Sequence, residues 1–264
     1  MSLSPIQIQG LDDPRLDALL ARPKPETDAE LADRVAQIMA EVRTGGDQAL
    51  VSLGEALDRT PAKRLWASDE DFAQAEMALD NDLIDAIDTA IATISEFHRA
   101  GKPTAYEVET ASGVTCQAEW RALKSVGLYV PAGTAPLPST AIMLAVPATL
   151  AGCQNIVLAT PPGPDGLADP AVLFIAKRLR VKQVLVAGGA QAIAAMAYGT
   201  ETVPKVDKLF GPGNRFVTEA KRQASLTLDG AAMDMPAGPS EVMVVADESA
   251  QADFVAADLL SQAE

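Results

Sequence analysis

Apolar residues recur at helical spacing through most of the first hundred positions, and this pattern predicts a helical beginning. Thr27 and Glu30 form a capping-box signature, and Gly45-Gly46 predicts the end of the helix that they begin. The apolar face of this helix carries Leu31, Val35, Ile38 and Val42. The stretch "SDEDF" predicts the start of a shorter helix. A second long helix should then end near His98 and Gly101, with an apolar face of Leu83, Ile84, Ile87, Ile91, Ile94 and Phe97.

The pattern changes after Pro103, where polar and apolar residues begin to alternate. The stretches "TAYEVET" and "GVTCQAEW" have the period of two that is typical of strands. Ser112-Gly113 lies between them, so we expect a β-hairpin.

From Val126 onward, short apolar strands alternate with helical stretches. The predicted strands are 126–130, 155–160, 183–188 and 208–210, and the predicted helices are about 139–151, 169–180, 190–198 and 214–225. Such alternation predicts an α/β fold with a parallel sheet and flanking helices. A further strand, "EVMVVA" (241–246), should lead into a closing amphipathic helix from Ala250, which offers Phe254, Leu259 and Leu260 for a buried face.

We expect three parts along the chain. Residues 1–128 form a helical N-terminal segment and a first globule that includes the hairpin. Residues 129–238 form a self-contained α/β globule, and residues 239–264 contribute a strand and a helix that return to the first globule.

The charge balance restricts the class of partner. The chain has 21 basic and 36 acidic residues, for a formal net charge of −15. This surface repels phosphate backbones and anionic lipids, so we expect neither nucleic acid nor a membrane as a partner. A small anionic cofactor can still be held by local groups.

Few residues point to a compartment or to acid–base chemistry. The N-terminus lacks a secretory signal, and two cysteines in a chain of this length indicate reduced thiols in a cytoplasmic protein. Cys116 and Cys153 have no histidine nearby in sequence and are predicted to be core residues. His98, the single histidine, ends a helix and is predicted to have a structural role.

Four loops follow the predicted parallel strands, and ligands bind at the carboxyl ends of such strands. These loops read "VPAGTAPLPST", "TPPGPDG", "GGAQA" and "GPGNR". Their glycines allow a bound group to approach the backbone, and the following helices offer free N–H groups to an anion. The usual G-x-G-x-x-G fingerprint is absent, so the loops by themselves predict only a ligand-binding α/β domain.

Three side chains in these loops suit a nucleotide. Tyr129 stands at a strand end, where its aromatic face can hold an adenine or nicotinamide ring. Gln191 and Asn214 begin helices beside glycines and can hydrogen-bond a ribose or a phosphate. Ser240, after a Gly-Pro turn, is either a turn residue that satisfies local backbone or a donor to a substrate.

Three stretches together resemble the histidinol dehydrogenases: "VGLYVPAGTAPLPSTAIM", "VAGGAQAIAAMAYGTETVPKVDKLFGPGN" and "DMPAGPSEVMVVADESAQADFVAADLLSQAE". The resemblance implies a fold like that of aldehyde dehydrogenases, with two incomplete Rossmann-like globules. It implies a zinc-dependent homodimer that oxidises L-histidinol through the aldehyde to L-histidine and reduces two NAD.

The resemblance also implies roles for individual residues. Tyr129, Gln191 and Asn214 match the NAD contacts, and Ser240 matches a substrate contact. Gln262 matches a zinc ligand that also touches the substrate. In the family "SQAE" is followed by a histidine that is the second zinc ligand, and the Glu-His pair that accepts the proton lies farther downstream. We therefore expect these 264 residues to be an inactive N-terminal fragment of the enzyme.

Two other interpretations remain open at this point. One is a relative of the same fold that oxidises another small alcohol, such as a sulfonated diol. The other is a non-catalytic nucleotide-binding or assembly module. The "GTAPLPST" loop favours histidinol over the first alternative.

Overall fold

The computed structural model describes residues 10, 12–20, 29–58, 60–132, 136–236 and 242–260. By its contacts the chain divides into two units, Met1–Glu30 and Leu31–Glu264. The first contains the short helix α1 (Leu16–Leu20) and the first two residues of α2 (Ala29–Leu57), and the second contains the rest of α2 and the other described elements. The expected boundaries after residues 128 and 238 stay predictions.

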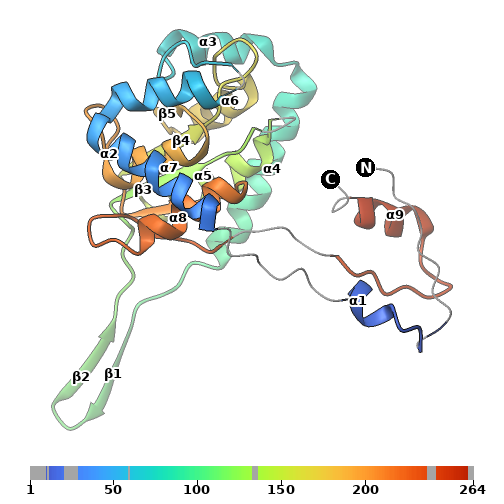
Figure 1. Ribbon diagram of the computed structural model, residues 1–264. Coiled ribbons are helices and arrows are strands. Elements are labelled where there is room, and N and C mark those ends of the chain that lie inside the picture. Colours follow the sequence, from blue (N-terminus) through green and yellow to red (C-terminus); the bar gives the residue numbers. More distant parts are fainter. Residues whose placement is uncertain are drawn as a thin grey trace. The chain divides into compact units, whose positions relative to one another are not determined.

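A five-stranded parallel sheet forms the centre of the second unit, which confirms the predicted α/β fold (Figure 1). Its strands are β3 (Ser125–Tyr129), β4 (Asn155–Thr160), β5 (Gln183–Val186), β6 (Lys208–Phe210) and β7 (Ala232–Met233). The spatial order is β5-β4-β3-β6-β7. Along the sequence, β4 and β5 are added on one side of β3, and β6 and β7 are then added on its other side. This reversal is the switch point at which open parallel sheets bind ligands.

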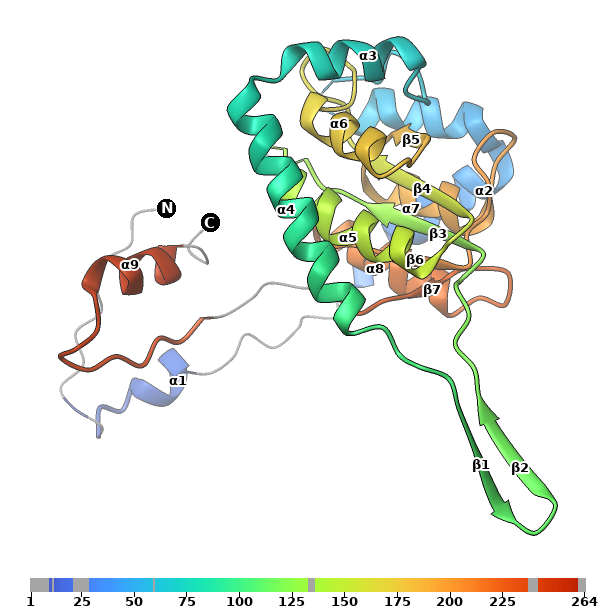
Figure 2. The same ribbon diagram turned by 180° about the vertical axis from the view of Figure 1, so that it is seen from behind.

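Helices cover both faces of the sheet (Figure 2). The helices α7 (Gly189–Tyr198) and α8 (Arg215–Ser225) pack on one face together with α2 (Ala29–Leu57). The other face is covered by α5 (Pro138–Ala151) and α6 (Pro170–Arg178). Alternate residues of β3 point to opposite faces: Val126 and Leu128 join the second core and Tyr129 joins the first.

Two further helices pack outside α5 and α6. Helix α3 (Asp69–Ala78) contacts α6, and α4 (Asn81–Ala100) contacts α5. Ser68 caps α3 with a complete capping box, as "SDEDF" predicts. Leu83 and Phe97 are exceptions to the predicted apolar face of α4, because both side chains are exposed.

The predicted helix end at Gly45-Gly46 is a kink. Gly46 has φ 56°, and a second helical stretch follows it directly within α2. The side chain of Glu201 accepts a hydrogen bond of 2.7 Å from the backbone N–H of Asp47 and so caps this second stretch. Leu50 and Leu53 of the second stretch are buried, and the sequence pattern did not predict it as a helix.

The predicted hairpin is confirmed as β1 (Tyr106–Ala111) paired with β2 (Val114–Ala118), and it extends away from the sheet (Figure 1). The register places Tyr106 and Val108 on the same face as Cys116 and Ala118. Cys116 is exposed there, so its prediction as a core residue is wrong: the hairpin has no second layer over this face among the described residues. Cys153 is half-buried, and both thiols are free.

Strand β5 lies at one edge of the sheet and is covered by the connection between α2 and α3. The backbone N–H of Val186 donates to the carbonyl of Leu65 (2.7 Å), and that of Ala67 donates to the carbonyl of Val184 (3.0 Å). Trp66 forms an antiparallel bridge with Leu185. This cover removes free backbone groups from an edge that would otherwise pair with other chains.

The predicted strand over 241–246 is wrong for its described part, 242–246, which forms no strand. None of the described residues pairs with it, and a strand without a partner leaves its backbone groups to water. The closing helix is present as α9 (Ala252–Leu260), but Phe254, Leu259 and Leu260 are exposed. No helix in the described ranges combines the length and the apolarity that crossing a bilayer demands.

Candidate functional site

The carboxyl ends of β3, β5 and β6 bring together the glycine-containing turns predicted from the sequence. Gly188-Gly189 joins β5 to α7, and Gly211 follows β6 directly. A Cβ on Gly211 would lie 2.2 Å from the carbonyl oxygen of Tyr129, so the β6 turn packs directly on the end of β3. The switch point is therefore a set of closely packed backbone turns, as dinucleotide sites require.

Tyr129 lies inside this set, with only 3% of its surface exposed. Its hydroxyl oxygen accepts a hydrogen bond of 3.1 Å from the backbone N–H of Gly189. Burial raises the pKa of Tyr129 to about 12, and the charge of Asp58 acts in the same direction. The ring packs in the core here, and the expectation that its aromatic face holds a nucleotide ring stays a prediction. The hydroxyl fixes the Gly189 turn.

Gln191 is buried beneath the same turn, with 2% of its surface exposed. Its Nε2 donates a long hydrogen bond of 3.5 Å to Oδ1 of Asp58. Gly189 has φ 64°, and a Cβ there would stand 2.6 Å from Oε1 of Gln191. Only glycine allows both the left-handed backbone and the buried amide, so the Gly189 turn and Gln191 depend on each other.

Asn214 caps α8 at the neighbouring strand end. Its Oδ1 accepts hydrogen bonds from the backbone N–H groups of Phe216 (3.0 Å) and Val217 (3.1 Å). The side chain is exposed, so it can cap the helix and still meet a ligand. The structure therefore brings all three residues predicted to contact NAD to the carboxyl edge of one sheet.

A buried ion pair that the sequence pattern missed holds the β6 turn. Lys221 of α8, 2% exposed, pairs with Asp234 just after β7, and its Nζ also donates to the carbonyl of Gly211 (2.7 Å). Oδ2 of Asp234 accepts a hydrogen bond of 2.8 Å from the N–H of Gly211. Both backbone groups of Gly211 are thus engaged by charged side chains. The one signal in the sequence is a lysine between the apolar positions Val217 and Ala224 of an amphipathic helix.

Asp58, just after α2, also belongs to this region and was not identified by the sequence pattern. It borders a cavity of about 100 Å³ that also touches Val186 and Ala187 at the end of β5. Desolvation by burial raises its pKa from 3.8 to about 6. Nothing in the spacing around Asp58 distinguishes it from other acidic residues at helix ends.

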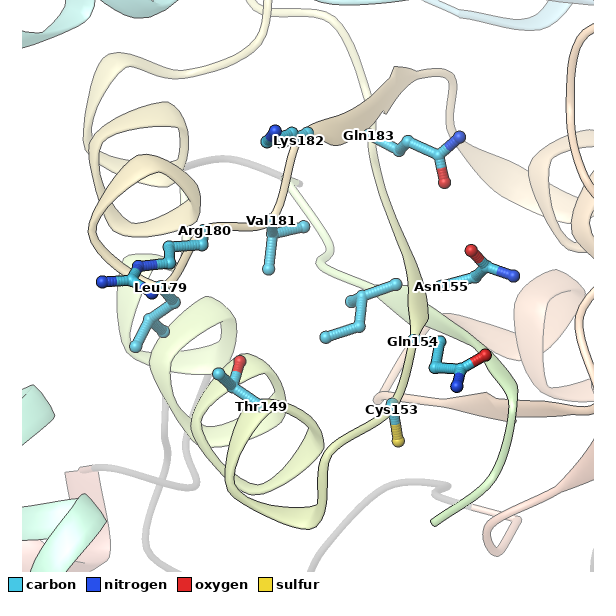
Figure 3. Close-up of a pocket in the computed structure, with 10 residues that line it drawn as sticks. Thr149, Cys153, Gln154, Asn155, Leu179, Arg180, Val181, Lys182 and Gln183 are labelled. Atoms are coloured by element: carbon cyan, nitrogen blue, oxygen red, sulfur yellow. The ribbon is translucent and has the colours of Figure 1, made fainter.

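A larger cavity of about 530 Å³ lies at the opposite end of the sheet, where β4 and β5 begin (Figure 3). Figure 3 shows amide side chains on one side of it and Arg180 on the other; the amides are Gln154, Asn155 and Gln183. Among the described residues, its lining includes no carboxylate and none of Tyr129, Gln191 and Asn214. It lies away from the switch point, so we do not assign the nucleotide to it.

The remaining predicted site residues are not placed. Ser240 and Gln262 lie outside the described residues, so their predicted roles with substrate and zinc stay predictions. Within the ranges that the structure describes, no group of three His, Cys, Asp or Glu side chains is arranged to hold a metal ion. His98 is half-buried at the end of α4 and meets Phe97 edge-on at 5.6 Å, which suits the structural role predicted for it.

Comparison with known proteins gives one consistent result. The family model described as histidinol dehydrogenase matches residues 21–264. The chain is 56% identical to a histidinol dehydrogenase of Xanthomonas oryzae pv. oryzae over 250 residues, which is 95% of this chain and 58% of that protein. It is 50% identical to one from Vibrio vulnificus, over 97% of this chain and 58% of that protein.

A solved structure agrees with these sequences. The crystal structure of histidinol dehydrogenase from Elizabethkingia anophelis superimposes with a TM-score of 0.87 at 42% identity. The match covers 94% of this chain and 57% of the other. The chain thus spans about 58% of the length of the curated relatives that it matches.

Proposed function

Because the chain belongs to the histidinol dehydrogenase family, we propose that it carries the NAD-binding part of an enzyme that oxidises L-histidinol through L-histidinal to L-histidine. The observation that carries this proposal is the packing of Tyr129, Gly189 and Gln191 at the switch point of the sheet. When bound, NAD supplies the hydride acceptor of the reaction.

The described residues fit this cofactor. Helix α7 begins at a glycine turn, and the N-terminus of a helix favours an anion such as a phosphate; Gln191 is a buried amide beside this turn. Asn214 offers a second amide across the switch point. We propose that Gln191 and Asn214 bind and orient the dinucleotide. Tyr129 holds the Gly189 turn in place.

The zinc, the substrate contacts and the homodimer are proposals that rest on the family resemblance. We propose that Gln262 binds zinc and touches L-histidinol, and that Ser240 contacts the same substrate. The described residues supply no set of metal ligands. A sulfonated diol as substrate is the alternative, and comparing the two alcohols with a longer form of the protein would decide between them.

We further propose that a polypeptide of these 264 residues, assayed by itself, does not oxidise L-histidinol. In the family the proton-accepting Glu-His pair lies beyond the part of the relatives that this chain matches, and the chain spans 58% of their length. Without a base that accepts the proton of the alcohol group, transfer of the hydride to NAD is not catalysed. Turnover by this polypeptide would contradict the proposal.

Binding of NAD to this chain tests the cofactor site directly. A ligand that binds the native state at a hundred times its Kd stabilises it by about 2.7 kcal/mol, which raises the melting temperature by several degrees. We expect NAD to do so, and we expect Gln191→Leu to lower the affinity at least tenfold.

The matched control is Gln154→Leu, because Gln154 is an exposed glutamine at the opposite end of the sheet. We expect its affinity for NAD to equal that of the parent chain. If NAD binds neither the parent chain nor the control, the proposed function is wrong for this part of the protein.

A further inference from the structure

We propose that Asp58 reads the sugar of the bound dinucleotide: its carboxylate accepts hydrogen bonds from the vicinal hydroxyls of a ribose and rejects a cofactor that carries a phosphate there. This inference rests on the proposed function, because it assigns the bound nucleotide to the switch point. It identifies a specificity-determining residue that none of the sequence motifs contains.

Asp58 lies at the end of the sheet to which we assign the nucleotide. The cavity that it borders is closed on one side by Val186 and Ala187, where β5 ends and the Gly188-Gly189 turn begins. Its volume of about 100 Å³ holds the hydroxyl edge of a ribose but not a whole dinucleotide. The side chain of Asp58 therefore reaches the carboxyl edge of the sheet from the residue that follows α2, a different part of the chain from the loops that carry the other contacts.

Asp58 contacts Gln191, one of the residues predicted to bind NAD. At 3.5 Å the hydrogen bond from Gln191 is long, and it uses only Oδ1. An ionised carboxylate has about four acceptor positions, so Asp58 keeps capacity for two hydroxyl donors. The same amide that we assign to NAD thus touches the carboxylate that we assign to the ribose.

Two described basic residues, Lys63 and Arg64, line the same cavity as Asp58. Of the described basic residues that line it, Arg64 donates to Ser68 and pairs with Asp71, whereas Lys63 forms no ion pair. None of the described residues forms an ion pair with Asp58. A half-buried carboxylate without a cationic partner costs stability, which is typical of sites that gain a partner only when a ligand binds.

The chemistry follows from these contacts. In doubly wound domains an acidic side chain commonly accepts hydrogen bonds from the ribose 2′-hydroxyl, and the same charge repels a 2′-phosphate. Those domains carry the acid on their second strand, about twenty residues after the glycine loop. Here the acid comes from a segment 133 residues before Gln191, so the usual spacing does not reveal it.

The test compares the dissociation constants of NAD and NADP by calorimetry on this chain. We expect the parent chain to bind NAD at least tenfold more tightly than NADP. Asp58→Asn keeps the shape and one acceptor but removes the charge, so we expect it to weaken NAD binding and to reduce the ratio of the two constants by about tenfold. Asp58→Ser is a second variant in case Asp58→Asn does not fold.

The matched control is Glu55→Gln, which makes the same change of charge on the same cavity at a residue with no contact to Gln191. We expect it to leave the NADP-to-NAD ratio unchanged. An equal effect of Glu55→Gln would overturn the inference, because general repulsion would then explain the preference. An unchanged ratio in Asp58→Asn, with NAD still bound, would overturn it while leaving the proposed function intact. Failure of NAD to bind the parent chain would instead be a failure of the proposed function.

Discussion

Lys221 illustrates how one buried side chain positions a backbone turn. Its ammonium group contacts both Asp234 and the carbonyl of Gly211, while Asp234 holds the N–H of the same glycine. Gly211 in turn packs against the end of β3. The ion pair therefore stabilises the geometry of the switch point as well as the fold.

Replacing Lys221 by methionine should lower the free energy of unfolding by about 3 kcal/mol, because Asp234 is left without its cationic partner. Urea denaturation measures this loss. The double variant Lys221→Met with Asp234→Asn should recover part of it, since the uncompensated charge is gone. An equal loss in both variants would show that packing, and not charge, accounts for the effect.

Asp58 makes the stability of the protein depend on pH. Its folded-state pKa is about 6 against an ordinary value of 3.8, so the folded chain binds a proton that the unfolded chain has already released between these values. Stability should therefore fall as the pH rises from about 4 to 6 and then stay lower.

The variant Asp58→Asn should accordingly be more stable than the parent above pH 6, by about 1 kcal/mol once the partial exposure of the side chain is allowed for. The difference should shrink toward pH 4, because the folded parent becomes protonated and therefore uncharged at this position. Thermal melting across pH 4 to 8 measures it, and a difference that is constant with pH would contradict the assignment of the raised pKa to Asp58.

At this scale the sequence identified residues whose positions follow from a strand and the turn after it. Gln191 and Asn214 are of this kind, because a short apolar strand followed by glycine places them at the sheet edge. Asp58 and Lys221 are different. Their burial and their partners depend on segments far away in the chain, and no local spacing encodes such contacts.

Helix α2 shows how a distant side chain decides whether a helix stops or bends. Gly46 leaves helical geometry, yet the chain continues as a helix because Glu201 binds the N–H of Asp47. A Cβ on Gly46 would overlap the carboxylate of Glu201, so the glycine also makes room for this cap.

The variant Glu201→Ala should lower the free energy of unfolding by about 1 kcal/mol, the usual cost of losing a side-chain cap. Chemical denaturation measures it, with Glu96→Ala as a control because Glu96 is exposed on α4. If the two variants lose the same stability, the cap contributes nothing.

The elements that the sequence predicted well are those with their own local pattern. Strands β3 to β6 and the helices between them match their apolar periods, and the hairpin matches its alternation. The segment 242–246 has an equally apolar composition but forms no strand. Composition predicts the tendency of a segment, whereas a strand also needs a neighbour with free backbone groups.

For the molecule as a whole, the division after Glu30 predicts that the second unit folds without the first. A chain that lacks residues 1–28 keeps all of α2 and should melt within about 2 °C of the parent. Calorimetry measures the transition. A drop of ten degrees or more would show that the first unit contributes to the stability of the second.

The two edges of the central sheet are unequal. Residues 65–67 occupy the outer side of β5, whereas β7 at the far edge pairs with β6 over only two residues. Among the described residues, a covering segment pairs with β5 and none pairs with the outer side of β7, so we expect an additional strand to join at the β7 edge. A peptide intended to block extension of the sheet should therefore be designed to pair with the β7 edge.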